Sequence, residues 1–133
     1  MKIKFLKGIE KDPEPFRNAL INLYDPSVDV ETKFNLLTQV EGIGPFIAIQ
    51  FIASIDKMKY CVISEDVMEA MRNLNLADAV PTKITTIDDY LYLNKMCIKL
   101  SQYFENRFKF GLPIVHSFLY HYNKYFRKKG EWL

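Results

Sequence analysis

The sequence predicts an all-α protein, a single compact domain of about six helices over residues 1–133. Apolar side chains recur at spacings of three and four along most of the chain, which is the period of an amphipathic helix. Glycine and proline are scarce, at five and six residues in 133, and they stand at the ends of the periodic segments. Apolar residues make up 49% of the sequence, so a chain of this length can bury a core.

The N-terminal part is predicted to begin with an arm and to continue with two helices. Within residues 1–9, polar and apolar side chains alternate over Lys2, Ile3, Lys4 and Phe5, but no second strand is expected to pair with them, so we expect an extended arm laid on the helices. Asp12 followed by Pro13 is typical of a helix start, and this helix should end near Asp25-Pro26, because a residue before proline avoids the helical region. Asp29 is a good cap for a second helix, expected over residues 30–39.

The segment Gly42-Ile43-Gly44 separates two helical patterns. Its glycines allow a tight turn with positive φ where needed, and Pro45 suits the first position of the next helix, expected over residues 45–56. The amides at and after the turn would point out of a helix N-terminus, where an anion is favoured. We therefore predict a phosphate site here, against the alternative that the glycines make only a tight helix–helix connection.

Three further helices are expected in the rest of the chain. Ser64 is a good cap for the first of them and is followed by two acidic residues. Residues 86–89 resemble a capping box at the start of a long helix that should end near residue 107. The last helix should begin at the Gly-Leu-Pro sequence of residues 111–113 and end near residue 130. The tyrosines and phenylalanines of these last two helices fall on helical stripes, so we expect them mostly in the core and not as base-stacking platforms.

Composition argues against several classes of site. Cys61 and Cys97 lie far apart in sequence and no Cys/His ligand pattern exists, so we predict reduced, buried thiols and no zinc or iron–sulfur centre. His116 and His121 are five residues apart, on different faces of a helix, which argues against a metal pair. No apolar run is long enough to span a membrane or to act as a signal peptide, so we expect no membrane partner and a cytoplasmic protein, nucleoid-associated if it binds DNA. The formal net charge of +2 is weak evidence for a polyanionic partner.

Residues 40–48, VEGIGPFIA, resemble the hairpin of the helix-hairpin-helix DNA glycosylases, the endonuclease III-like superfamily. Residues 61–70, CVISEDVMEA, are similar to the segment in which those enzymes place a catalytic aspartate at the start of a helix. The resemblance covers about a third of the chain. The position of that aspartate falls on Ser64, and the position of the lysine nucleophile of bifunctional members falls on Phe46. The resemblance therefore implies the fold of this family with its known catalysis lost.

The resemblance also implies how DNA would be held. In this family the hairpin amides bind a DNA phosphate, often with a monovalent cation ligated by backbone carbonyls. Carried onto this chain, the phosphate-binding positions are Gly42, Gly44, Phe46 and Ile47, and no other cofactor or metal is expected. Such contacts position a protein without reading sequence. Lysines and an arginine outside the hairpin are candidate basic contacts: Lys57, Lys59, Lys124, Arg127 and Lys128.

Three functions follow from these observations as hypotheses. The first is a non-catalytic, sequence-independent DNA-binding module of DNA repair or processing that contacts phosphates through the hairpin. The second is a DNA glycosylase with a displaced catalytic carboxylate, Glu65 or Asp66, because excision of a base needs a carboxylate that Ser64 does not supply. The third is a protein-interaction module that keeps only the fold and binds a protein partner.

Overall fold

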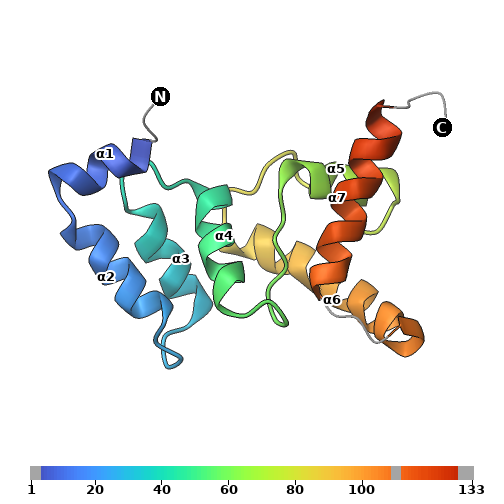
Figure 1. Ribbon diagram of the computed structural model, residues 1–133, viewed down its shortest axis with the longest axis horizontal. Helices are drawn as coiled ribbons and strands as arrows, with labels where there is room; N and C mark the ends of the chain where they lie inside the picture. The colour runs from blue at the N-terminus through green and yellow to red at the C-terminus, as the bar shows by residue number, and fades with distance from the viewer. Residues whose placement is uncertain (1–3, 109–111, 129–133) are drawn as a thin grey trace. The chain divides into compact units, whose positions relative to one another are not determined.

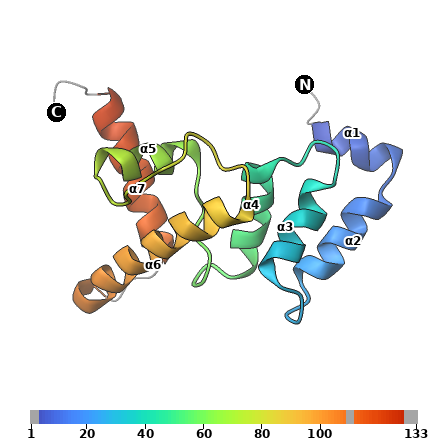
Figure 2. The same cartoon turned by 180° about the vertical axis from the view of Figure 1, so that it is seen from behind.

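The computed structural model describes residues 4–108 and 112–128, without the side chains of Phe5 and of residues 105–108 and 126–128. Over these residues the chain forms seven α-helices and no strand, which confirms the all-α class (Figure 1). The backbone divides into two compact units, Met1–Ile55 and Asp56–Leu133, and each is described by itself (Figures 1 and 2). The single domain predicted from the sequence stays a prediction.

The first unit contains α1 (Lys4–Lys11), α2 (Glu14–Leu23), α3 (Val30–Thr38) and α4 (Pro45–Ile55). The helix α1 shows that the predicted extended arm is wrong from residue 4 onward, and it brings the described helices to seven where about six were expected. The polar–apolar alternation that suggested an arm covers only a few residues. Over a longer window the lysines of this segment recur at spacings of three and four, which fits one face of a helix.

Two helix starts in the first unit follow from short-range hydrogen bonds. The amide of Glu14 donates to Asp12 Oδ1 at 3.2 Å, although Pro13 and not Asp12 occupies the cap position of α2. The amide of Thr32 donates to Asp29 Oδ1 at 2.7 Å, which confirms Asp29 as the cap of α3. Pro45 is the first residue of α4, as predicted.

The apolar faces of the first unit are buried where the helical spacing places them. α3 packs against both α2 and α4. The fully or nearly fully buried side chains are contributed by α2, α3, α4 and the turn between the last two: Ala19, Leu23, Phe34, Leu37, Val40, Ile43, Ala48, Ile49, Ile52 and Ala53. Because Ile43 is buried between two glycines, it anchors the turn to the core.

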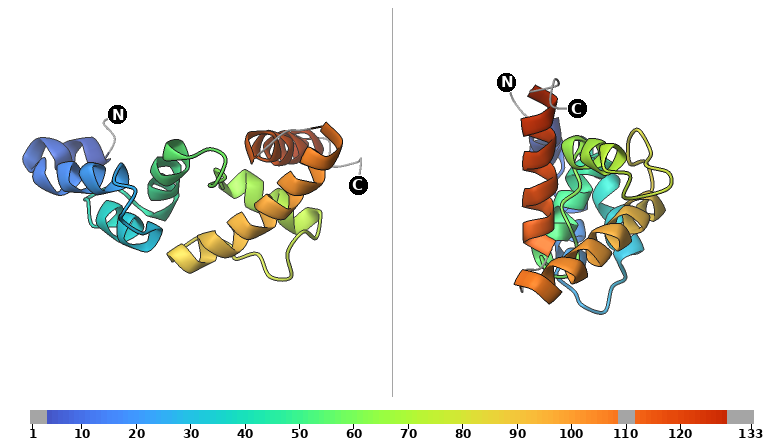
Figure 3. Two further views of the ribbon diagram at one scale, coloured as in Figure 1. Left: turned by 90° about the horizontal axis from the view of Figure 1, so that it is seen from below. Right: turned by 90° about the vertical axis from the view of Figure 1, so that its right-hand side faces the viewer.

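The second unit contains α5 (Glu65–Asn73), α6 (Ile87–Phe108) and α7 (Leu112–Lys128), and α7 packs against both of the others (Figure 3). Ser64 caps α5, since the amide of Val67 donates to its Oγ at 3.3 Å. The predicted capping box at α6 is confirmed: the amide of Asp89 donates to Thr86 Oγ1 at 3.2 Å and the amide of Thr86 donates to Asp89 Oδ2 at 3.3 Å.

A buried polar network ties the segment before α5 to α6. Asn94 accepts from the amide of Cys61 at 2.8 Å and donates to the carbonyl of Lys59 at 3.0 Å, while the Tyr90 hydroxyl donates to the carbonyl of Cys61 at 2.8 Å. Burial raises the pKa of Tyr90 well above its usual value. Cys61 and Cys97 are both buried and reduced, as predicted, and a hydrogen bond between their thiols, with burial, raises the pKa of Cys97.

The prediction that the rings of the last two helices lie mostly in the core is wrong for several of them. Tyr90 is fully buried, but Tyr103 is 53% exposed, Phe118 is 39% exposed and Tyr125 is 48% exposed. The side chain of Phe126, expected in the core, lies outside the described residues. The error arises because aromatic residues occur on two faces of α7, and only the face with Val115 and Leu119 is turned to the core.

Candidate nucleic-acid interface

The connection between α3 and α4 is a tight turn closed by its own backbone. The amide of Ile43 donates to the carbonyl of Val40 at 3.0 Å, which defines a four-residue turn over residues 40–43. Gly42, at its third position, has φ of 86°, a value that L side chains rarely adopt. The turn therefore requires a glycine at position 42.

The first amides of α4 are open at this turn. The amide of Ala48 donates to the carbonyl of Gly44 at 3.0 Å, which is the first bond of α4, and Pro45 has no amide hydrogen. No hydrogen bond joins the amides of Phe46 and Ile47 to any residue that the structure describes. Gly44 itself is exposed, and a Cβ placed on it would meet no atom within 4 Å. Unpaired donors at a helix N-terminus next to open space are a favourable seat for an anion.

The helix α1, which the sequence did not predict, lies beside this turn. A Cβ placed on Gly8 would lie 3.1 Å from Glu41 Cβ, so the two backbones approach closely there. Lys4, Lys7 and Lys11 are exposed on α1, and their spacing of three and four puts them on one side of the helix. The spacing of these lysines could have indicated the helix in the sequence. The short polar–apolar alternation at residues 1–5 suggested an arm instead.

The backbone carbonyls of the turn are the candidate ligands for the monovalent cation that the resemblance implies. The carbonyls of Val40 and Gly44 accept backbone hydrogen bonds within the motif. The carbonyl of Glu41 lies close to Gly8 of α1, whereas no backbone hydrogen bond to the carbonyls of Gly42 and Ile43 occurs among the described residues, and neutral oxygens of this kind fit such a cation. The cation stays a prediction, and no step of the function proposed below depends on it.

The acidic start of α5 is engaged with α7. Asp66 Oδ1 accepts from Asn123 Nδ2 at 2.9 Å, and Asp66 Oδ2 lies 3.3 Å from Lys124 Nζ. Glu69 also accepts from Asn123 Nδ2, at 3.4 Å, and Glu65 is exposed. Asp66, named as a displaced catalytic acid, is therefore bound to the neighbouring helix through both carboxylate oxygens. The displaced-carboxylate alternative stays a prediction.

The candidate basic contacts are dispersed in the second unit. Lys57 and Lys59 are exposed in the segment that precedes α5, and Lys59 Nζ lies 5.4 Å from the centre of the Tyr60 ring. Lys124 is partly buried, pairs with Asp66 and lies over the Tyr120 ring. The side chains of Arg127 and Lys128 lie outside the described residues.

The histidines have structural partners or face solvent. His116 Nδ1 lies 2.8 Å from the carbonyl of Val62, and its ring stacks on Tyr120. His121 is exposed, one turn along α7. Among the residues that the structure describes, no group of three or more His, Cys, Asp or Glu lies together as metal ligands would.

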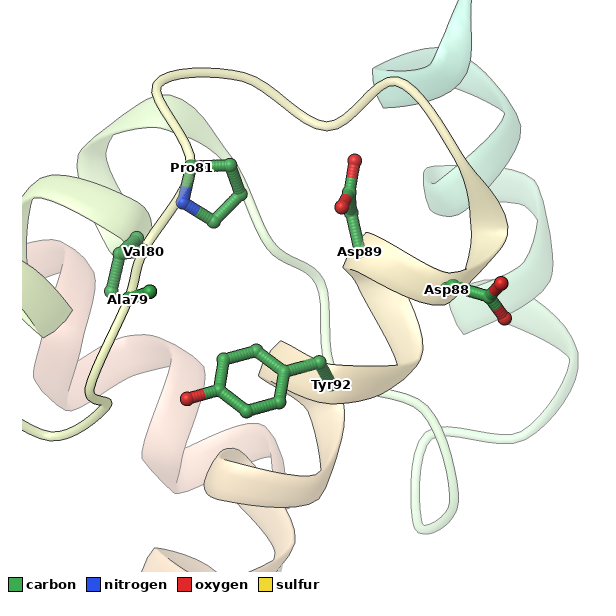
Figure 4. Close-up of a pocket in the computed structure, with 6 residues that line it drawn as sticks. All are labelled: Ala79, Val80, Pro81, Asp88, Asp89 and Tyr92. Carbon is green, nitrogen blue, oxygen red and sulfur yellow. The ribbon is translucent and has the colours of Figure 1, made fainter.

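An open pocket of about 410 Å³ lies between the loop before α6 and the first turns of α6 (Figure 4). Val80 and Pro81 line one side, and the Tyr92 ring extends toward the same loop. Asp89 is committed to capping, because it accepts from Thr85 and Thr86, and these hydrogen bonds, that from the Thr85 amide foremost, lower its pKa. The Asp88 carboxylate is directed away from the loop (Figure 4). The pocket thus presents mainly an apolar wall and one tyrosine.

Comparisons of the chain with protein-family models, with curated proteins and with solved structures found no match. Within residues 4–108 and 112–128, no helix combines the length and the apolar character that crossing a membrane requires.

Proposed function

We propose that this chain is a non-catalytic, sequence-independent DNA-binding module that contacts phosphates through the helix-hairpin-helix formed by α3, the turn and α4. The observation that carries the proposal is the open N-terminus of α4, where the amides of Phe46 and Ile47 have no acceptor among the described residues. A phosphate oxygen bound there would accept both amides and face the positive end of the helix dipole.

The residues around the turn favour binding of a nucleic-acid backbone with several phosphates over binding of a single anion. Gly44 leaves space for close approach of a backbone, since nothing lies within 4 Å of where its Cβ would be. The exposed lysines of α1 add positive charge next to the turn, which favours the neighbouring phosphates of the same strand. Neither feature reads a base edge, so binding is expected to show little sequence preference.

Gly44 offers a clean test because its replacement does not strain the fold. Aspartate is a favoured N-cap, so Gly44→Asp should leave the stability of α4 unchanged or improved. The same carboxylate would occupy the phosphate site and repel the ligand. The experiment is a fluorescence-anisotropy titration of a labelled 20-base-pair duplex at low salt with the wild-type chain and with Gly44→Asp. We expect the variant to bind about tenfold more weakly, the loss typical of one charged hydrogen-bonded contact.

A matched control places the same charge at another helix start. Thr86→Asp adds a carboxylate at the cap of α6 and should leave duplex affinity within about twofold of wild type. Equal affinity of wild type and Gly44→Asp, with duplex binding intact, would remove the turn from the account. Absence of duplex binding by the wild-type chain at low salt would reject DNA binding itself. If the same chain then formed a stable complex with a protein partner, the interaction-module alternative would be favoured.

A further inference from the structure

Charge and aromatic residues are unevenly distributed along this chain. Residues 90–133 carry eight Lys or Arg against two Asp or Glu, a net charge of +6, whereas residues 1–89 carry ten against fourteen, a net charge of −4. The same 44 C-terminal residues include 12 of the 19 aromatic residues. The overall charge of +2 therefore conceals a basic, ring-rich C-terminal third. That combination is typical of surfaces on which nucleic-acid strands stack.

The solvent face of α6 displays this combination in a single row. Tyr92, Lys95, Lys99 and Tyr103 follow one another at spacings of three, four and four, so they share one side of the helix. All four are exposed, Tyr92 by 37% and Tyr103 by 53%. From Tyr92 to Tyr103 the helix rises about 16 Å, the length of about five nucleotides at the spacing of a single strand in DNA. Neither lysine is paired with a carboxylate of the described residues.

Rings from α7 extend the row at the end of α6. The centre of the Tyr103 ring lies 5.9 Å from that of Phe104, which lies 5.8 Å from that of Phe118, and Phe118 lies 6.1 Å from Tyr122. Phe104 and Tyr122 are partly buried, whereas Tyr103 and Phe118 face solvent. Edge contacts with Phe104 and a tilted contact with Tyr122 restrict the exposed rings, so little side-chain freedom is left to lose on binding.

We propose that this surface, formed by Tyr92, Lys95, Lys99, Tyr103 and Phe118, binds single-stranded nucleic acid. Unpaired bases stack on the exposed rings, and the two lysines neutralise phosphates between them. A duplex is a poorer ligand because its bases are already stacked and paired and do not offer their faces to side chains. The inference goes beyond the DNA-binding function proposed above, because it uses other residues and needs nothing from the turn before α4.

The charge of the surface selects this occupant over a second copy of the chain. Self-association through the α6 row would bring the lysines of one copy against those of the other, and like charges in contact are unfavourable. A strand of phosphates and bases complements both features, since its charge matches the lysines and its apolar faces match the rings.

The test is a low-salt anisotropy titration of labelled oligo(dT) and oligo(rU), each 15 nucleotides long, alongside a 20-base-pair duplex. Tyr103→Ala should weaken binding of the single strands about tenfold and leave duplex binding unchanged, since one stacked base is lost. Tyr103→Phe, which keeps the ring, should retain wild-type affinity. The plot of log affinity against log salt has a negative slope, and Lys99→Gln should make this slope shallower by about 0.7, the value for one phosphate contact on a single strand. Comparison of the two oligonucleotides shows the combined effect of the 2′-hydroxyl and of the thymine methyl group.

The matched control is an exposed tyrosine outside the proposed surface. Tyr24→Ala removes a tyrosine of the first unit that is more exposed than Tyr103, at 71%, and should change nothing. Equal losses for Tyr103→Ala and Tyr24→Ala, or no binding of either oligonucleotide, would overturn the proposal. A wild-type chain that self-associates in solution, and that Tyr103→Ala makes monomeric, would assign the surface to a second copy instead. The function proposed for the turn is tested in the duplex titration with Gly44→Asp, so the two proposals fail in different measurements.

Discussion

The turn before α4 and the solvent face of α6 differ in what they offer a ligand. The turn offers backbone amides next to open space, since nothing would contact a Cβ on Gly44 and the amides of Phe46 and Ile47 have no acceptor among the described residues. The face of α6 offers side chains only, with rings and ammonium groups in a row. A backbone site suits the phosphate that every nucleic acid shares, whereas a ring site suits bases that are unpaired. Net charge is therefore a poor guide to these two proposed sites, because each would bind a nucleic acid through a different chemical group.

The largest effect on stability is expected from Asn94, which links the segment before α5 to α6 in the second unit. Asn94→Ala would leave the buried amide of Cys61 without a partner, at a cost of about 1–3 kcal/mol, and would also remove the hydrogen bond to the part-buried carbonyl of Lys59. We expect the free energy of unfolding to fall by about 3 kcal/mol, measured by urea denaturation. Amide hydrogen exchange in α2 and α3 reports on the first unit. If protection there falls as much as in α6, the two units unfold together and the comparison between them loses its thermodynamic meaning.

The second effect contrasts the two glycines of the turn. Gly42→Ala forces a residue with a Cβ into φ of 86° and should cost about 1–2 kcal/mol of stability. Gly44→Ala places its Cβ in open space, so its only expected cost is that of alanine as a poorer N-cap than glycine, about 0.5 kcal/mol. Thermal unfolding of the two variants measures the contrast. Equal losses would show that the turn geometry differs from the one described.

These glycines show how much of the fold and the site the sequence predicted. The turn, Pro45 and the caps at Asp29 and Ser64 were predicted correctly because each depends on residues within three positions of one another. The pairing of Asn94 with Cys61 joins residues 33 positions apart, and no local pattern indicates such a contact.

The predictions for α1 and for the exposed rings were wrong for a related reason. The helix α1 was predicted as an arm because a four-residue alternation is too short to distinguish a strand from a helix. Tyr103 and Phe118 were expected in the core because helical spacing gives the face of a residue but not which face the neighbouring helix covers. The exposed rings therefore became visible only in the structure.

A smaller effect is expected from the one acidic side chain of the turn. Glu41 is exposed next to the proposed phosphate site, so Glu41→Gln should remove a repulsion and raise duplex affinity about two- to threefold. The control is Glu31→Gln, an exposed acid in the first turn of α3. The gain should vanish at high salt. An equal gain in both variants would mean that the duplex responds to overall charge and not to the turn.

The smallest effect concerns pH and the capping box of α6. Hydrogen bonds from Thr85 and Thr86 lower the pKa of Asp89 in the folded state. Ionised Asp89 therefore stabilises the fold at neutral pH, and this contribution is lost as the pH falls below about 4, through the lowered pKa. Asp89→Asn should reduce stability slightly at pH 7 and not at pH 3, measured by thermal unfolding. A larger difference at pH 3 would reverse the sign and contradict the capping account.

The central claim is that a phosphate binds the open start of α4, and a titration followed by two-dimensional ¹H–¹⁵N NMR observes it directly. Addition of a short DNA duplex at low salt should shift the amide resonances of Gly44, Phe46 and Ile47 more than those elsewhere in the first unit. The shifts should be absent in Gly44→Asp. Resonances of these three residues that stay in place while the duplex binds would contradict the account.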